Sequence, residues 1–433
     1  MPSFISPLFP SPLFLSLLLP SLRAAMARRP RQAAKVLLLC IGGMSSAFFM
    51  GCNSSQPYTV SPTTGLPPTT TVASSNAYIG TQSPLNWTLT IDDKQNAYGY
   101  QSLPTDGSKP AAASGAFIPQ NGFLNFGAAG LALEIPGAGA VLRPGDNTTA
   151  PVVMVEQEGC MVLTGKQRYL VQGMVHTTDS TNANPIIYRR GDLVASTTSD
   201  GKTWSFADAE YFDADGSPIS LDYQGQPSAN SFAGACATAH GASSVSIDTS
   251  GAYHFPTTFR FGSAGMAVAD YTSSTSAMGF AQPLDPISTK SLAAADFRGI
   301  QVEYSSTAVT QPVSFGPALD GSAALNGGTY PNDDVTQIAD SSDLFVFGSQ
   351  SSSINGLFAS ATITVLDPRG GCAANGVGTG DLGLTPNGIA TCRLHLSAMV
   401  GQVGGKAFVV ASGIDLTVPG SSAPDIQFYL IQQ

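Results

Sequence analysis

The chain has 433 residues, of which 11% are charged, and a formal net charge of −10. An acidic surface repels phosphate backbones, so nucleic acid is excluded as a partner. Few charges together with 46 glycines and 30 prolines do not fit a charge-rich disordered chain or a helical cytosolic enzyme. They are typical of exported proteins built from short strands and turns.

The N-terminal region carries the pattern of an export signal. A basic stretch, with Arg28, Arg29, Arg31 and Lys35, precedes a largely apolar run over residues 36–50. Such a run has the length of the hydrophobic region of a signal peptide and is short for a membrane span.

Residues 1–25 do not extend this signal. They are apolar but contain five prolines, which remove helix donors and clash with the preceding turn. Because Met26 stands directly before the basic stretch, we predict that translation starts at Met26 and that residues 1–25 are an over-extended start.

The end of the apolar run, Phe49-Met50-Gly51-Cys52, resembles the lipobox of bacterial lipoproteins. The resemblance covers residues 26–55 only. It implies that the signal peptide is removed, that Cys52 becomes the first residue, and that its thiol carries a lipid. It also implies a membrane as partner and a location in the bacterial cell envelope, at the outer membrane or facing the periplasm. Two alternatives remain open, a buried free cysteine and secretion with cleavage elsewhere.

The part after the signal is more acidic than the whole chain. The first 52 residues hold five of the 19 basic residues and no acidic ones, so 14 basic and 29 acidic residues remain, a net charge of −15. Residues 52–77 are rich in Ser, Thr and Pro and have no apolar periodicity, which predicts a flexible tether. Residues 1–51 are therefore interpreted as start and signal, and 52–77 as a lipid-anchored tether.

Alternation of apolar and polar residues begins near Tyr78. In residues 85–91, Trp87 and Leu89 alternate with polar neighbours, which predicts a half-buried strand with these two side chains inside. Similar stretches recur to about Tyr271 and are joined by short glycine-containing turns, a pattern that favours antiparallel hairpins. We predict a first β domain over residues 78–271.

Residues 272–296 lose the alternation and are predicted to be a linker with one short helix capped by Ser288. A second β domain follows over residues 297–433, with Ile300 and Val302 inside it. Its last strand can pair with its first and so remove a free edge. The predicted fold is all-β, with antiparallel meanders forming two β-barrel or β-sandwich domains and at most short helices.

Four cysteines remain after Cys40 in the signal and Cys52 at the lipid site. An even number in an oxidising compartment predicts disulfides, and the locality of hairpins favours Cys160–Cys236 and Cys372–Cys392 over the two other pairings. The alternative is a metal site in which Cys236 and Cys392 meet two nearby histidines. The spacings match no paired zinc motif, so we expect no metal and no cofactor.

One motif match is interpreted as a loop and two are interpreted as turns. Gly378, Gly380 and Gly383 satisfy G-x-G-x-x-G, but a turn follows where a dinucleotide site needs a helix. Residues 200–203, DGKT, lack the first glycine of a phosphate-binding loop. Residues 213–216, DADG, lack the glycine and glutamate of a calcium loop, although weak calcium binding by two aspartates stays an alternative.

No catalytic residue is predicted. The chain has no G-x-S-x-G motif, and its acidic pairs, such as Asp333 and Asp334, are interpreted as solvated turns or strand faces. The imidazoles available as bases are His176, His240, His254 and His395. The sequence favours a binding or interaction module of the envelope, whose partner is a small ligand or an envelope protein. The alternative is an envelope hydrolase acting on a glycan or peptide.

Overall fold

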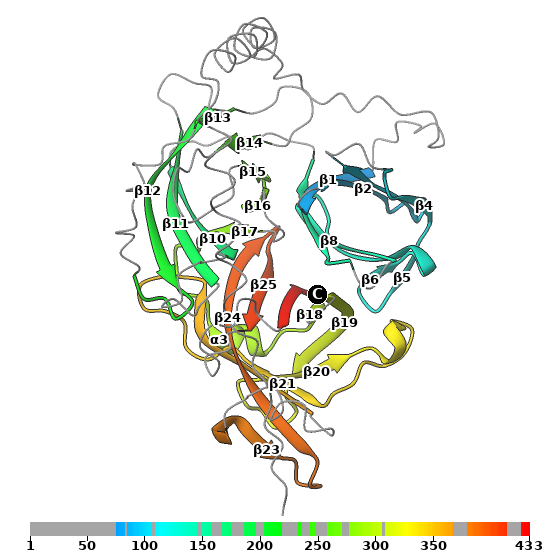
Figure 1. Cartoon of the computed structure of the whole chain (residues 1–433), viewed down its shortest axis with the longest axis vertical. Helices are drawn as coiled ribbons and strands as arrows, with labels where there is room; N and C mark the ends of the chain where they lie inside the picture. The colour runs from blue at the N-terminus through cyan, green and yellow to red at the C-terminus, as the bar shows by residue number, and fades with distance from the viewer. Residues whose placement is uncertain are drawn as a thin grey trace, which may run out of the picture. The chain divides into compact units, whose positions relative to one another are not determined.

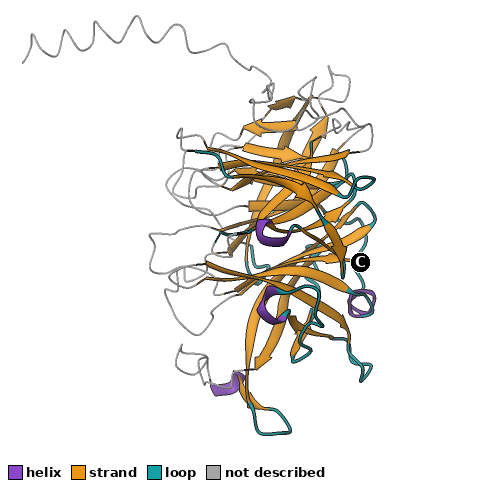
Figure 2. Ribbon diagram, turned by 90° about the vertical axis from the view of Figure 1, so that its right-hand side faces the viewer, coloured by secondary structure: helices purple, strands orange, loops and turns teal. Residues whose placement is uncertain are grey.

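A computed structural model describes fourteen stretches of the chain, all of them after residue 74. They are residues 75–82, 85–104, 109–145, 149–157, 166–174, 186–195, 203–218, 233–235, 243–246, 258–270, 277–304, 308–366, 379–413 and 426–433. Strands dominate these stretches and helices are short (Figure 2). All strand pairs are antiparallel, so the predicted all-β fold of meanders is confirmed.

The first sheet contains nine strands in the order β4-β3-β2-β1-β9-β8-β7-β6-β5 (Figure 1). They are β1 (Ser75–Gln82), β2 (Leu85–Asp92), β3 (Ala97–Pro104), β4 (Ala112–Ala116), β5 (Ile118–Gln120), β6 (Phe123–Asn125), β7 (Gly130–Ile135), β8 (Gly139–Pro144) and β9 (Val152–Glu156). The first strand pairs with the last. The two edges are β4 and β5, which only Phe117 separates, so the sheet is a nearly closed barrel.

The second sheet is a closed barrel of eight strands in chain order. They are β10 (Lys166–Met174), β11 (Ile186–Ala195), β12 (Thr203–Asp213), β13 (Ala233–Ala235), β14 (Ser243–Ser246), β15 (Thr258–Phe261), β16 (Met266–Asp270) and β17 (Ala277–Ala281). Its last strand, β17, pairs with its first, β10.

The third sheet also closes on itself. Its strands are β18 (Phe297–Tyr304), β19 (Ala308–Pro317), β20 (Leu325–Thr329), β21 (Asp343–Val346), β22 (Leu357–Leu366), β23 (Leu382–Leu384), β24 (Ala390–Val403), β25 (Lys406–Gly413) and β26 (Ile426–Gln432). The predicted pairing of the last strand with the first is confirmed, because β26 pairs with β18. Pairing of β22 with β24 completes the ring, and β23 adds to β24 outside it.

Helices among the described residues are single turns. The α-helix α3 (Thr289–Ala293) has the predicted cap, since the Ser288 hydroxyl accepts a hydrogen bond from the Ser291 N–H at 3.3 Å. Three 3₁₀ turns complete the set: η2 (Gly127–Ala129), η3 (Pro331–Asp333) and η4 (Thr379–Asp381). None of these helices has the length and apolar character that a membrane span requires.

The interiors of the first and third sheets are filled by side chains. One cluster of buried residues belongs entirely to the first sheet and includes Trp87 and Leu89, as predicted. A second belongs to the third sheet and its preceding helix, and it is built around phenylalanines. These are Phe297, Phe315, Phe345, Phe347, Phe358 and Phe428.

A further cluster joins the outer faces of all three sheets. It includes Leu133 of β7, Phe280 of β17 and Phe408 of β25. Ile300 and Val302 belong to this shared cluster, so the prediction of their burial is confirmed but their predicted place inside the second β domain is wrong. Along β18, Phe297 points into the third sheet, whereas Ile300 and Val302 stand at alternate positions and point to the outer face.

The stretch predicted as a linker contributes to the second barrel. Residues 277–281 form β17, in which Met278 and Phe280 are buried in the shared cluster. A β-carbon at Gly401 of β24 would lie 2.1 Å from the ring of Phe280, so the two sheets approach closely there. The division into two domains stays a prediction.

Candidate functional site

Most residues of the predicted sites lie outside the described stretches. These are Cys52, Cys160, Cys236 and Cys372, together with His176, His240 and His254. Cys392 is fully buried in β24 and is not a free thiol. The lipid site and the two disulfide pairings therefore stay predictions.

The described histidine, His395, forms a charged cluster with a neighbouring aspartate and arginine. Asp381 ends η4, and its Oδ2 lies 3.1 Å from His395 Nε2 on β24. Its other oxygen, Oδ1, lies 3.9 Å from Arg393 Nε, an ion-pair distance without a hydrogen bond. Pairing of β23 with β24 sets this geometry, because it places Asp381 beside the outward side chains of β24.

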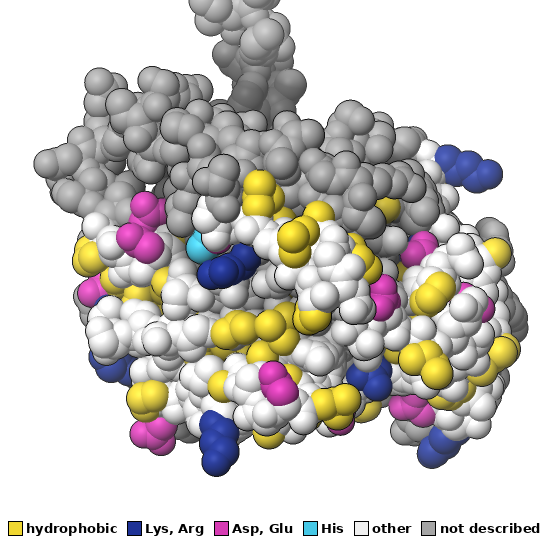
Figure 3. Space-filling view, turned by 90° about the horizontal axis from the view of Figure 1, so that it is seen from below, with side chains coloured by type: hydrophobic (Ala, Val, Ile, Leu, Met, Phe, Trp, Pro, Cys, Tyr) yellow, Lys and Arg dark blue, Asp and Glu magenta, His cyan; other side chains and the backbone are white. Residues whose placement is uncertain are grey.

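This cluster is accessible from outside. The side chains of His395 and Arg393 are 38% and 52% exposed, and the Asp381 carboxylate is 18% exposed. A histidine and a basic side chain are exposed together on the face in Figure 3. The hairpin beyond them carries two exposed aliphatic side chains, Leu384 and Ile389.

The arrangement is the one in which a carboxylate orients an imidazole. Because Asp381 holds Nε2, the other ring nitrogen points away from the carboxylate and can accept or donate a proton. Thr362 of β22 is the cross-strand partner of His395, and opposite residues have β-carbons about 5 Å apart. A hydroxyl on β22, an imidazole on β24 and a carboxylate on η4 thus follow one another.

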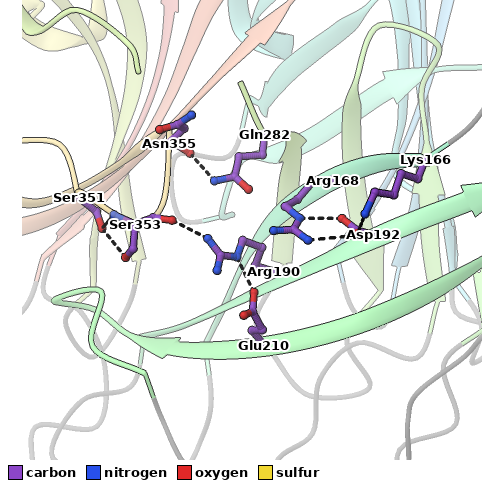
Figure 4. Close-up of polar contacts among 9 residues, drawn as sticks. All are labelled: Lys166, Arg168, Arg190, Asp192, Glu210, Gln282, Ser351, Ser353 and Asn355. Carbon is purple, nitrogen blue, oxygen red and sulfur yellow. Dashed lines mark hydrogen bonds and ion pairs between the residues drawn. The ribbon is translucent and has the colours of Figure 1, made fainter. Parts of the chain in front are cut away.

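A second polar group lies on the outer face of the second barrel (Figure 4). Asp192 of β11 accepts from Arg168 Nε at 2.6 Å and Nη2 at 3.1 Å, and from Lys166 Nζ at 2.9 Å. Its carboxylate is 1% exposed. The hydrogen bonds from Arg168, aided by Lys166, lower the pKa of Asp192 to about 2. All three charges are paired with one another, so this group stabilises the sheet.

Arg190 connects the second barrel to the third sheet. Its Nε donates to Glu210 Oε2 at 2.7 Å, its Nη1 donates to the Ser353 carbonyl at 2.6 Å, and its guanidinium lies 4.9 Å from the centre of the Phe212 ring. In Figure 4 the loop that carries Ser353 also carries Asn355, whose carbonyl accepts from Gln282 at 3.2 Å. These contacts hold two sheets together.

Polar groups are also present inside the first sheet. The Tyr78 hydroxyl and the Asn76 amide donate to Glu134 Oε1 at 2.5 and 2.9 Å. Burial raises the pKa of Glu134 despite both hydrogen bonds. Trp87 Nε1 is buried and has no hydrogen-bond partner within the described stretches.

The third sheet holds one buried carboxylate with a shifted pKa. Burial, with repulsion from Asp340 and Glu303, raises the pKa of Asp343 to about 6, although Ser342 donates to its Oδ1 at 3.2 Å. The two charged groups that act on Asp343, Asp340 and Glu303, are both acidic.

Residues 213–216 form the predicted turn. The Asp213 and Asp215 carboxylates accept backbone N–H groups of Ala214 and Ser217, and Gly216 has a φ of 81°. In the glycine motif, Gly380 lies in η4 and Gly383 in β23, and Gly378 and residues 200–202 lie outside the described stretches. Asp333 pairs with Arg143 at 2.6 Å across two sheets. Within the described stretches, no group of three or more His, Cys, Asp or Glu residues could hold a metal ion.

Sequence reasoning missed the partners of His395 and Asp333. Asp381 lies in a Gly-rich stretch interpreted as a plain loop, and Arg143 is 190 residues from Asp333 in the chain. The alternation in residues 392–396 contained a signal, because His395 and Arg393 occupy the same strand face.

No protein-family model matches this chain, and no curated protein matches it significantly.

Proposed function

We propose that this protein is a lipid-anchored binding or interaction module of the bacterial envelope. The export signal, the lipobox-like end of that signal and the Ser/Thr/Pro tether support this proposal. The lipid on Cys52 attaches the chain to a membrane, and the tether separates the β-sheets from it. The partner is a small ligand or another envelope protein.

The observation that supports the binding role is that large side chains fill the interiors of the first and third sheets. The interiors of the first and third sheets are packed with large buried side chains, including Tyr78, Trp87, Phe315 and Phe345. A filled barrel holds no ligand inside, so recognition falls to strand edges, loops and outer faces.

The anchor is tested by replacing Cys52. Cys52→Ser should move the protein from the membrane fraction to the soluble fraction, and the wild type should carry a diacylglycerol mass on Cys52. A conservative change two residues on, Ser54→Ala, should leave the protein in the membrane. Mature wild-type protein that retains residues before Cys52 would exclude the anchor.

The oxidised envelope is also the setting in which the remaining cysteines would pair. Export and the even number of cysteines support Cys160–Cys236 and Cys372–Cys392. Mass spectrometry of unreduced peptides should show both links, and stoichiometric zinc in the purified protein would contradict them.

A second candidate function, an envelope hydrolase acting on a glycan or peptide, is favoured by the Asp381–His395 pair. An imidazole oriented by a carboxylate serves as a general base, and its removal typically costs a factor of about 10²–10⁴ in rate. In this function His395 is the base and Asp381 holds the ring in place.

This second candidate requires turnover. The wild type should hydrolyse peptidoglycan or unfolded peptide substrates, and His395→Ala should lower the rate of hydrolysis by at least about 100-fold. Asp381→Asn should change the pH profile as well as the rate, and the exposed Lys290→Ala should leave both unchanged. Absence of turnover by the wild type leaves binding as the function.

A further inference from the structure

The first sheet has an open edge at β4. This strand pairs with β3 over Ala112–Ala116 and with no other strand among the described residues. Four of its five residues are exposed. They include Gly115, which occupies a position on the inner face of the strand. The edge is therefore uncovered by the described part of the chain.

The hydrogen-bond pattern identifies the groups on this edge. Phe117 donates its N–H to the Asn96 carbonyl at 2.8 Å, and Ser102 donates its N–H to the Ala111 carbonyl at 2.7 Å. Hydrogen-bonded pairs alternate along an antiparallel ladder, so Ala113 and Gly115 also bond to β3. The N–H and C=O groups of Ala112, Ser114 and Ala116 consequently point to the open edge.

This edge lacks the features that normally prevent strand addition. Natural edge strands carry charges, prolines or bulges that block pairing with another chain. The sequence of β4, Ala-Ala-Ser-Gly-Ala, has none of these, and its small side chains leave the backbone accessible. Directly after it, Ile118 is 63% exposed and offers an apolar contact beside the edge.

The gap in backbone pairing beside β4 is bridged by side chains. The rings of Tyr98 and Phe126 are stacked with centroids 3.9 Å apart, and the Tyr100 hydroxyl donates to the Ala129 carbonyl at 2.8 Å. These contacts hold the two sides of the sheet together at the seam between β4 and β6. The seam has aromatic side chains on its floor and an unpaired strand on one side.

We propose that the open edge of β4 binds an extended segment of a partner protein, which adds to the first sheet as a further strand. The proposal rests on the interaction role given above and names its partner class. Backbone groups of the partner pair with Ala112, Ser114 and Ala116, and one of its side chains contacts the exposed Ile118. A neutral or basic segment fits best, since the mature chain has a net charge of −15.

A single extended strand fits this edge better than a second copy of the protein. Five residues bury far less than the roughly 1,000 Å² of a stable interface between folded proteins. Two copies, each strongly acidic, also repel one another. A flexible segment can bury more surface, because it can continue along the seam after the five pairing residues. A neutral or basic segment is also not repelled by the acidic chain.

The test separates backbone pairing from side-chain contact. Ser114→Pro removes an edge N–H without touching the groups that bond to β3, whereas Ser114→Ala keeps that N–H and is the matched control. Ala116→Lys places a charge on the edge and serves as an independent variant. The probe is a fluorescein-labelled short peptide of alternating Val and Thr flanked by Lys, and the same peptide with Pro at alternate positions is the negative control.

Fluorescence anisotropy with the purified full chain should show binding to wild type and Ser114→Ala. Affinity should fall about tenfold or more for Ser114→Pro and Ala116→Lys, with thermal unfolding curves confirming that both fold. Equal binding by Ser114→Pro, or no binding by wild type at millimolar peptide, overturns the proposal. Self-association lost in Ser114→Pro would overturn it in favour of a second copy. Cys52→Ser should bind the peptide like the wild type. A failure of the lipid-anchor proposal would therefore leave peptide binding unchanged, and the two proposals can be tested separately.

Discussion

The first and third sheets share a plan but differ in what fills them. Both are antiparallel meanders in which the first strand pairs with the last. The third closes through β22–β24 pairing and contains a ring cluster of phenylalanines, with Phe345 in contact with Phe315, Phe347 and Phe428.

The first sheet lacks that last pairing and contains aromatic residues with polar ends. The Tyr100 hydroxyl crosses the seam to a backbone carbonyl, Tyr78 bonds to Glu134, and Trp87 Nε1 is unpartnered. In the ring closed by backbone pairing, the aromatic cluster consists of phenylalanines without polar ends, and Asp343 is a polar exception on the same strand face as Phe345. Where backbone pairing is missing, side chains must bridge the seam and satisfy its polar groups.

The largest expected effect comes from truncating the apolar interior of the third sheet. Phe345→Ala removes a fully buried ring and should lower the free energy of unfolding by about 3–5 kcal/mol. Leu319→Ala, at a side chain that is 98% exposed, should change it by less than about 0.5 kcal/mol. Urea denaturation measures both, and equal effects would show that the ring cluster is not a core.

The buried carboxylate of the third sheet should give a pH-dependent effect of the opposite sign. Burial raises the pKa of Asp343 to about 6, so its contribution to stability is complete below pH 4 and is lost as the pH rises through 6. Asp343→Asn should therefore stabilise the protein by about 1–3 kcal/mol at pH 8 and have little effect at pH 4. Denaturation at both pH values tests this. The exposed Asp285→Asn is the control, and a Asp343→Asn variant that is destabilised at pH 8 would contradict the assignment.

The seam of the first sheet should respond to loss of one hydrogen bond. Tyr100→Phe removes the bond to the Ala129 carbonyl and should cost about 1 kcal/mol. Amide exchange in β4 should also become faster, since the seam loosens beside it. Tyr98→Phe keeps the ring stack with Phe126 and should leave that exchange unchanged. Identical exchange in both variants would show that the hydroxyl does not hold the seam.

The smallest effect is expected at the unpartnered indole. Trp87→Phe removes a buried N–H whose isolation costs about 1–3 kcal/mol, and this gain offsets the volume that the smaller ring leaves empty. The net change in unfolding free energy should stay below about 1 kcal/mol. A loss above about 3 kcal/mol in thermal denaturation would mean that the indole N–H has a partner in solution.

Alternation predicted the strand content, the buried face of β2 and the pairing of the last strand with the first. It could not separate the sheets, because a strand such as β9, which faces the shared cluster, is apolar on both sides. Val152 and Met154 point into the first sheet, while Val153 and Val155 join the shared cluster. In β17 the alternation is one of size rather than polarity, so Gly279 between Met278 and Phe280 concealed a strand.

The candidate sites were harder to predict because they depend on pairing between distant segments. His395 was recognised as a possible base, but its orienting carboxylate comes from a turn that only β23 pairing brings near. The open edge of β4 has no residue signature at all. The edge is open because no second strand among the described residues pairs with Ala-Ala-Ser-Gly-Ala. The sequence of this strand does not show how many strands will pair with it.

The pairing of first and last strands has a consequence for how such a chain can be assembled. In each sheet the residue after the last strand donates its N–H to a carbonyl at the start of the first: Gln157 to Ala77, Gln282 to Arg168 and Gln433 to Asp296. Entry and exit of the chain are therefore one strand spacing apart, about 5 Å. A unit with adjacent ends can be inserted into a surface turn of a host without stretching the host backbone, or be circularly permuted across those ends.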